Sequence, residues 1–180
     1  MPSSDLSVLL TSGSEELHVE YKAWMDTSQS EAKAKLARHF AALANHGGGF
    51  LIFGVDDATK QPQGVTEFPL SMFGEDTFSS IIKKYLDPSF QVRVEKVELD
   101  GVLYPVVIVP SHGSRPIIAI ADGPHVQRSQ RTGVRQGALY VRSVGPESIA
   151  IKQPDDWTAL LERCLSPETG AYHAAILIST

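Results

Sequence analysis

The spacing of apolar residues predicts a helix followed by a buried strand in the first third of the chain. Within residues 31–45, apolar side chains recur every three to four positions, as on a helix face that packs against a sheet. Glycines at 47–49 then favour a helix end, because glycine adopts the left-handed conformation of a C-terminal cap. The apolar run at 50–55 is too short for a helix and predicts a central strand.

The remaining elements follow from the same periodicities. Helices are predicted at 75–87 and 154–165, and strands at 17–22, 90–99, 102–109, 116–121 and 138–142. Asp100 and Gly101 are a two-residue hairpin signal. This order predicts an α+β fold, with a mixed sheet, helices on one face, an added hairpin and a C-terminal helix. On that last helix, the side chains expected to face inward are Trp157, Leu160, Leu161 and Cys164.

The length of 180 residues indicates one main domain, which we place at 14–165. Residues 1–13 are expected to form an N-terminal docking segment. Residues 166–180 end in an apolar stretch, AAILIST, and are expected to be a tail or the start of a following segment in a longer parent protein. A further domain in that protein and a homodimer are therefore among the expected partners.

Charge and cysteine content narrow the class of protein. The net charge is −5, but five arginines fall between 111 and 145 while acidic residues concentrate before 32, so the total does not exclude a nucleic-acid surface. The single cysteine excludes an internal disulfide and a cysteine-rich zinc site. It fits a reducing compartment, and we expect a cytoplasmic protein. No apolar run reaches the length of a membrane span, and no secretory leader opens the chain, so no membrane partner is expected.

Three segments carry a family resemblance. They are EELHVEYK at 15–22, then ALANHGGG at 42–49 with FGVDD at 53–57 and Gly64, and lastly Arg115-Pro116 with YVR at 140–142 and Gly145. Together they resemble the AlbA-type domain of the Schlafen family, which in bacteria is also described as a divergent AAA-type ATP-binding or DNA-binding domain. The resemblance implies an Alba-like βαβαββ fold and a role with nucleic acid, either RNA or DNA.

The resemblance also implies a candidate catalytic site. In nuclease members three carboxylates form the site, and by motif position these are Glu15, Glu20 and Asp57. Glu16 competes with Glu15, and Asp56 competes with Asp57. Oxygen-rich sites of this kind suit Mg²⁺ or Mn²⁺, which can bridge phosphate oxygens and activate water. The domain would then be a metal-dependent endoribonuclease acting on structured RNA; the alternatives are a non-catalytic DNA-binding or regulatory module, or ATP binding.

Other side chains have two readings. Residues expected to contact nucleic acid are Lys22, Arg115, Arg128, Arg131, Arg135 and Arg142. A structural reading instead pairs Glu20 with Lys22 or an arginine on a solvated strand face and makes Asp57 the cap of the turn before Thr59. The glycines at 47–49 follow a helix and precede a strand without a lysine after them. They therefore do not form a P-loop, and ATP binding is poorly supported on physical grounds.

Two histidines and an asparagine leave similar alternatives. His18 and His39 could assist proton transfer near neutral pH, or simply lie on the surface. Asn45, beside the glycines, could hold a ligand or cap the helix.

Overall fold

The computed structural model describes residues 6–11, 16–126, 130–143, 145 and 147–165, and the structural statements below concern these residues. Four α-helices are described: α1 (Ser7–Thr11), α2 (Ser30–His46), α3 (Glu75–Tyr85) and α4 (Pro154–Leu165), together with the 3-10 helix η1 (Leu70–Phe73). The strands of the main sheet are β1 (Val19–Lys22), β2 (Gly49–Phe53), β4 (Arg93–Leu99) and β5 (Val102–Val109). Six short strands lie outside it: β3 (Leu86–Asp87), β6 (Ile118–Ala119), β7 (His125–Val126), β8 (Gln130–Arg131), β9 (Tyr140–Ser143) and β10 (Glu147–Ala150).

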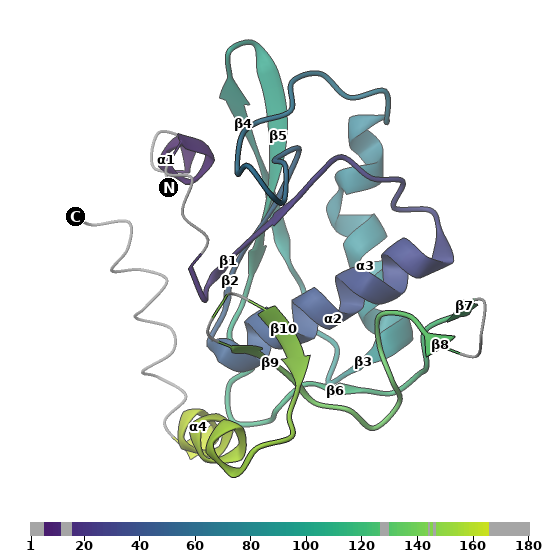
Figure 1. The fold of residues 1–180 in the computed structure, drawn as a ribbon, viewed down its shortest axis with the longest axis vertical. Helices are drawn as coiled ribbons and strands as arrows, with labels where there is room; N and C mark the ends of the chain where they lie inside the picture. Colours follow the sequence, from purple (N-terminus) through teal and green to yellow (C-terminus); the bar gives the residue numbers. More distant parts are fainter. Residues whose placement is uncertain (1–5, 12–15, 127–129, 144, 146, 166–180) are drawn as a thin grey trace.

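The main sheet is mixed, with strand order β1-β2-β5-β4 (Figure 1). β1 and β2 are parallel, with Glu20 opposite Leu51, whereas β5 is antiparallel to both of its neighbours, β2 and β4. β4 and β5 form the predicted hairpin, and both turn residues have positive φ, 51° at Asp100 and 77° at Gly101. The predicted α+β fold with a mixed sheet is confirmed.

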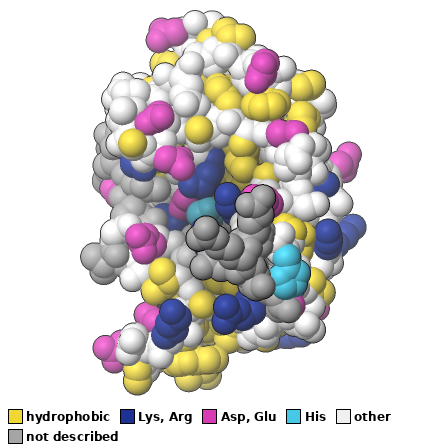
Figure 2. Space-filling view, turned by 45° about the vertical axis from the view of Figure 1, so that its right-hand side comes forward, with side chains coloured by type: hydrophobic (Ala, Val, Ile, Leu, Met, Phe, Trp, Pro, Cys, Tyr) yellow, Lys and Arg dark blue, Asp and Glu magenta, His cyan; other side chains and the backbone are white. Residues whose placement is uncertain are grey.

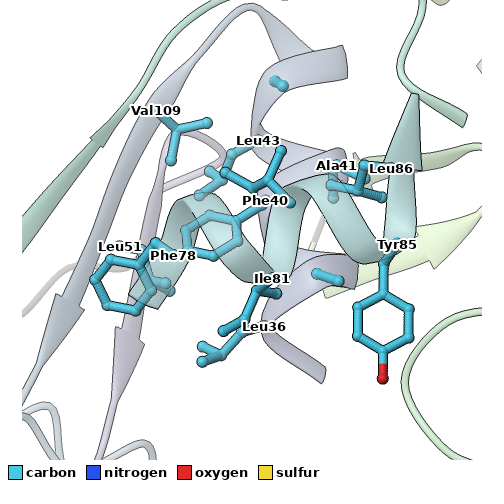
Figure 3. Close-up of a cluster of buried hydrophobic side chains, with 14 of the residues drawn as sticks. Leu36, Phe40, Ala41, Leu43, Leu51, Phe78, Ile81, Tyr85, Leu86 and Val109 are labelled. Carbon is cyan, nitrogen blue, oxygen red and sulfur yellow. The ribbon is translucent and has the colours of Figure 1, made fainter. Parts of the chain in front are cut away.

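Helices α2 and α3 pack on one face of this sheet (Figure 1). Their apolar stripes meet the inward side chains of β2 and β5, and Figure 3 shows Phe40 of α2 and Phe78 of α3 in this core. The two rings are 5.4 Å apart in an edge-to-face arrangement. The opposite face is covered in part by α1, whose Leu10 is buried against β1, and the hydroxyl of Tyr21 donates to the backbone oxygen of Leu9 over 2.6 Å.

The glycines after α2 end the helix and allow β1 and β2 to approach closely. Gly47 has φ 114° and donates its N–H to the backbone oxygen of Ala44, which ends the helix. A Cβ on Gly49 would lie 2.2 Å from the backbone oxygen of His18, so only glycine allows β1 to lie this close to β2 at that point. The predicted helix end is confirmed, and the glycines belong to packing rather than to a phosphate loop.

Some boundaries differ from the prediction. The second helix stops at Tyr85, because the next two residues pair with β6 as β3. The strand at 138–142 is present as β9, but its partner β10 was not predicted. On α4 only Leu160 is fully buried; Trp157 and Leu161 are 44% and 53% exposed, so their inward placement was wrong. Periodicity locates an apolar stripe, but it does not say how much of that stripe a neighbouring element covers.

None of the helices in the described part of the chain has the length and apolar content needed to span a bilayer.

Candidate functional site

Glu20 lies at the centre of a buried polar cluster on the α2 side of the sheet. Its side chain is only 4% exposed, although the structural reading of the sequence placed it on a solvated strand face. Oε1 lies 2.6 Å from Nζ of Lys22 and 3.3 Å from Nδ1 of His39, while Oε2 accepts a hydrogen bond from Arg142. The structural reading was therefore right about the partners of Glu20 and wrong about its exposure.

Arg142 reaches this cluster from β9 and also closes the free edge of β1. The backbone oxygens of residues 18 and 22 face β2 and accept hydrogen bonds from the N–H groups of Phe50 and Gly54. Those of Leu17 and Val19 consequently point to the other side, where Nε and Nη2 of Arg142 donate to them, each over 3.0 Å. Nη1 also donates to Oγ of Ser148 over 3.1 Å. One guanidinium thus joins β9 and β10 to the edge strand of the main sheet.

His39 contributes the third group around Glu20. It is buried on α2, so the surface placement considered from the sequence was wrong. Nδ1 lies 3.0 Å from Oγ of Ser148 and 3.3 Å from the Glu20 carboxylate. An ionised carboxylate only accepts hydrogen bonds, which places the ring proton on Nδ1. Nε2 then carries a lone pair, and no described residue donates to it.

Burial affects the two acid–base groups of the cluster differently. Burial alone would raise the pKa of Glu20, but the hydrogen bond with His39 and the positive charges of Lys22 and Arg142 outweigh it, so that pKa lies well below its usual range. For His39, burial outweighs the nearby carboxylate and lowers the pKa. Near neutral pH the cluster therefore holds an ionised Glu20 beside a neutral imidazole.

The two aspartates after β2 have separate roles. Asp56 uses one carboxylate oxygen to accept hydrogen bonds from the backbone N–H groups of Ala58 and Thr59, over 3.0 and 2.7 Å. The turn-capping role considered for Asp57 is thus carried out by Asp56. Asp57 is 57% exposed, and its Oδ2 lies 3.3 Å from Nζ of Lys22. The ammonium of Lys22 is therefore shared by Glu20 and Asp57.

Of the two glutamates that precede β1, only Glu16 is described, and it does not join this arrangement. Glu15 lies outside the described residues. Glu16 pairs with His18 over 3.4 Å at the surface.

The arginines of the second half are dispersed. Arg115 is exposed and lies 3.7 Å from the carboxylate of Asp87. Arg128 lies outside the described residues, and Arg131 is placed only by its backbone, which pairs with His125 between β8 and β7. Arg142 is buried in the cluster, and Arg135 lines a groove beside it. Among the predicted arginines whose side chains are described, Arg135 and Arg142 thus lie close to the Glu20 cluster and Arg115 does not.

That groove has a volume of about 950 Å³ and lies between α2, residues 133–138, β10 and the start of α4. Glu20 and His39 form part of its wall. Figure 2 shows basic, acidic and histidine side chains close together around a hollow of this face. The other charged residues of the lining are Arg38, Arg135, Lys152, Glu147 and Asp156.

Arg38, Lys152 and Ser148 are residues that the sequence did not identify. Arg38 directly precedes His39 on α2, but the helix also carries Lys33 and Lys35, so charge alone did not distinguish it. Ser148 and Lys152 lie on and just after β10, a strand whose sequence, ESIA, has no clear periodicity. Their position therefore depends on the pairing of β10 with β9.

Asn45 is used for structure rather than for a helix cap. Its Nδ2 donates to the backbone oxygens of Ile117 and Tyr140, and its Oδ1 accepts from the N–H of Ile117, at 2.7 to 2.9 Å. This fully buried amide connects the segments around Ile117 and Tyr140 to the end of α2.

The described carboxylates do not fit Mg²⁺ or Mn²⁺ as they stand. Both oxygens of Glu20 face positively charged side chains, and Asp57 faces the same ammonium. Within the described ranges, no three His, Cys, Asp or Glu side chains form a group that could hold a metal ion.

Comparisons with known proteins agree with this fold. A family model described as Schlafen, AlbA_2 matches residues 15–145. The crystal structure of the DIP2311 protein from Corynebacterium diphtheriae is similar, with 19% identity and a TM-score of 0.55 over 89% of this chain. The match covers 28% of DIP2311, so this chain corresponds to little more than a quarter of that protein. At this identity the likeness establishes a shared fold.

A second structure is the N-terminal domain of a RecG-related protein from Nitrosomonas europaea, with 22% identity and a TM-score of 0.49. The match covers 76% of this chain and 92% of that domain. The search of curated proteins found no match.

Proposed function

The chain belongs to the Schlafen AlbA_2 family, and from this membership and the charge of its groove we propose that it is a nucleic-acid-binding domain. The observation that carries the proposal is a set of three cations in the groove lining, Arg38, Arg135 and Lys152. None of them forms an ion pair with a described residue. Unpaired cations that share one groove are available to neutralise phosphates.

The balance of charge in the groove supports this assignment. Glu20 is neutralised by Lys22 and Arg142, so it does not repel an anion as a free carboxylate would. Of the remaining lining residues, the three cations outnumber the two carboxylates, Glu147 and Asp156. The overall charge of −5 therefore does not describe this surface.

In this proposal the Glu20 cluster positions the groove wall. Arg142 has internal acceptors for Nε, Nη1 and Nη2, so its role is to hold β9 and β10 against β1 rather than to contact phosphate. Lys22, at the exposed side of the cluster, and Arg115 are proposed as additional phosphate contacts. Such contacts orient the nucleic acid without reading its sequence.

A metal-dependent endoribonuclease is the second candidate. The observation that favours it is the convergence of Glu20 and Asp57 on one positive charge, the ammonium of Lys22. Because a divalent cation at this place would have to displace that ammonium, we rank binding ahead of cleavage.

Salt-titrated binding to a tRNA and to duplex DNA, each with and without Mn²⁺, tests both candidates. We expect affinity to fall steeply as salt rises, with no cleavage of either ligand. The double variant Arg135→Gln/Lys152→Gln should bind more weakly, while the matched control Arg93→Gln/Lys96→Gln on β4 should bind as the wild type. Salt-independent binding, or none, would contradict the proposal. Cleavage that requires Mn²⁺ and is lost in Asp57→Asn would instead establish the nuclease.

A further inference from the structure

The groove is the size of a small-ligand pocket rather than of a duplex cradle. Its volume of about 950 Å³ lies at the upper end of the range of about 300–1,000 Å³ that is usual for such pockets. A double helix, whose major groove alone is about 12 Å wide, is much larger than the ligands that fill a pocket of this volume, so we expect a duplex to contact the rim.

Arg38 places a positive charge inside the groove. It projects from α2 next to His39 and is only partly exposed. Its Nε is shielded from solvent and has no hydrogen-bond partner among the residues that the structure describes. The partly exposed side chain lines the groove, so a phosphate that enters the groove can supply acceptors to the guanidinium.

Two further cations lie at the rim. Arg135 and Lys152 are both exposed and line the same groove as Arg38. A nucleic-acid strand that passes from the rim into the groove can therefore bring successive phosphates to cations at different depths. A rigid duplex lying on the surface reaches only the outer two.

The rest of the lining suits unpaired bases. Its partly exposed aliphatic side chains include Ala138, Ile149 and Ile151, which can contact the flat face of any base. The polar part includes the neutral ring of His39, whose Nε2 lone pair can accept a hydrogen bond from a base or sugar. In a duplex these base faces and edges are stacked or paired.

We propose that this groove binds single-stranded nucleic acid, or the single-stranded end of a duplex, with one phosphate contacting Arg38 and others contacting Arg135 and Lys152. This inference rests on the proposed nucleic-acid-binding function and specifies the form of the ligand.

Fluorescence anisotropy with matched oligonucleotides tests the inference. The ligands are a single strand of about 12 nucleotides, as DNA and as RNA, the blunt duplex of the same sequence, and that duplex with a single-stranded overhang. We expect the single strands and the overhang duplex to bind at least about tenfold more tightly than the blunt duplex. A blunt duplex that binds equally well or better would overturn the inference and leave the proposed function standing. A chain that binds none of the four overturns both.

Substitutions locate the binding site. Arg38→Gln should weaken single-strand binding by about tenfold and reduce the slope of log affinity against log salt by about 0.7, as expected for one lost phosphate contact on a single strand. Arg93→Gln on β4, the matched control, should change neither quantity. Circular dichroism shows whether each variant is folded. If Arg38→Gln does not fold, Arg135→Gln at the exposed rim replaces it as the test variant. Wild-type single-strand affinity in the folded variants would overturn the placement of the ligand in this groove.

Discussion

Arg142 of β9 and Glu20 of β1 form a buried ion pair, although 122 positions separate them in the sequence. The same guanidinium donates to the backbone oxygens of Leu17 and Val19 at the free edge of the sheet. This pair therefore connects the first strand to a hairpin from the second half of the chain. It also sets one wall of the groove in which we place the ligand.

Removal of the negative charge at this position should destabilise the protein. Glu20→Gln would leave the buried guanidinium of Arg142 without its anion and Lys22 with Asp57 alone. Loss of one partner of a buried ion pair costs about 3–5 kcal/mol. Urea denaturation should show a loss of this order in the free energy of unfolding, whereas Glu16→Gln at the exposed surface should change it by less than about 1 kcal/mol. Equal effects of the two substitutions would show that the pair contributes little.

The geometry of Arg142 should matter as well as its charge. In Arg142→Lys an ammonium replaces the planar guanidinium and cannot reach Glu20, Leu17 and Val19 together. Each buried acceptor left unpaired costs about 1–3 kcal/mol. We expect a loss in the free energy of unfolding of at least that size, measured in urea beside Arg93→Lys on the exposed part of β4 as the control. Full stability of Arg142→Lys would mean that charge alone holds the edge.

Asn45 should be equally sensitive. Asn45→Ala removes one acceptor and two donated hydrogen bonds from a fully buried site, and the groups of Ile117 and Tyr140 lose their partner. We expect a loss of about 1–3 kcal/mol for each group left without a partner. Asn45→Asp keeps the acceptor for Ile117 N–H but loses both donors, and thermal unfolding should therefore show it to be destabilised too. Retention of the wild-type melting temperature in both variants would contradict this role.

The contact between β1 and β2 should not tolerate a side chain at residue 49. In Gly49→Ala the new Cβ would lie 2.2 Å from a backbone oxygen of His18, and the backbone has to move. Overpacking of this kind costs about 1–3 kcal/mol. Gly74→Ala is the matched control, because its φ is −91° and its Cβ would meet an oxygen only at 3.3 Å. Chemical denaturation should therefore separate the two variants, and equal stability would refute the steric explanation.

His112 should make the stability depend on pH. Its ring nitrogens are shielded from solvent, and burial, together with the charge of Arg163, lowers its pKa. In the unfolded chain a histidine titrates near 6.5, so below that pH the unfolded state binds more protons and stability falls. When the pH is lowered from 7.5 to 5.5, the free energy of unfolding should therefore decrease less in His112→Gln than in the wild type. The control His125→Gln, at an exposed position, should keep the wild-type difference; the same difference in His112→Gln would contradict the prediction.

Local patterns were enough for most of the fold. The apolar stripe of α2, the glycines after it and the run of β2 act over neighbouring residues, so their spacing predicted them correctly. The turn at Asp100 and Gly101 needs positive φ at both positions, and this requirement is visible in the residue types. Short strands such as β3 and β10 were missed because pairing with a distant segment, rather than their own sequence, makes them strands.

The sequence by itself determined the order of helices and strands, the helix end at the glycines and the family to which the chain belongs. Tertiary structure alone decided that Glu20 is buried, that Arg142 is the arginine that pairs with it beside His39, and that Arg38 lies in the groove with Arg135 and Lys152. The physical reason is that periodicity records which face of an element is apolar, whereas the partner of a polar side chain depends on contacts between elements, which for Glu20 and Arg142 are 122 positions apart.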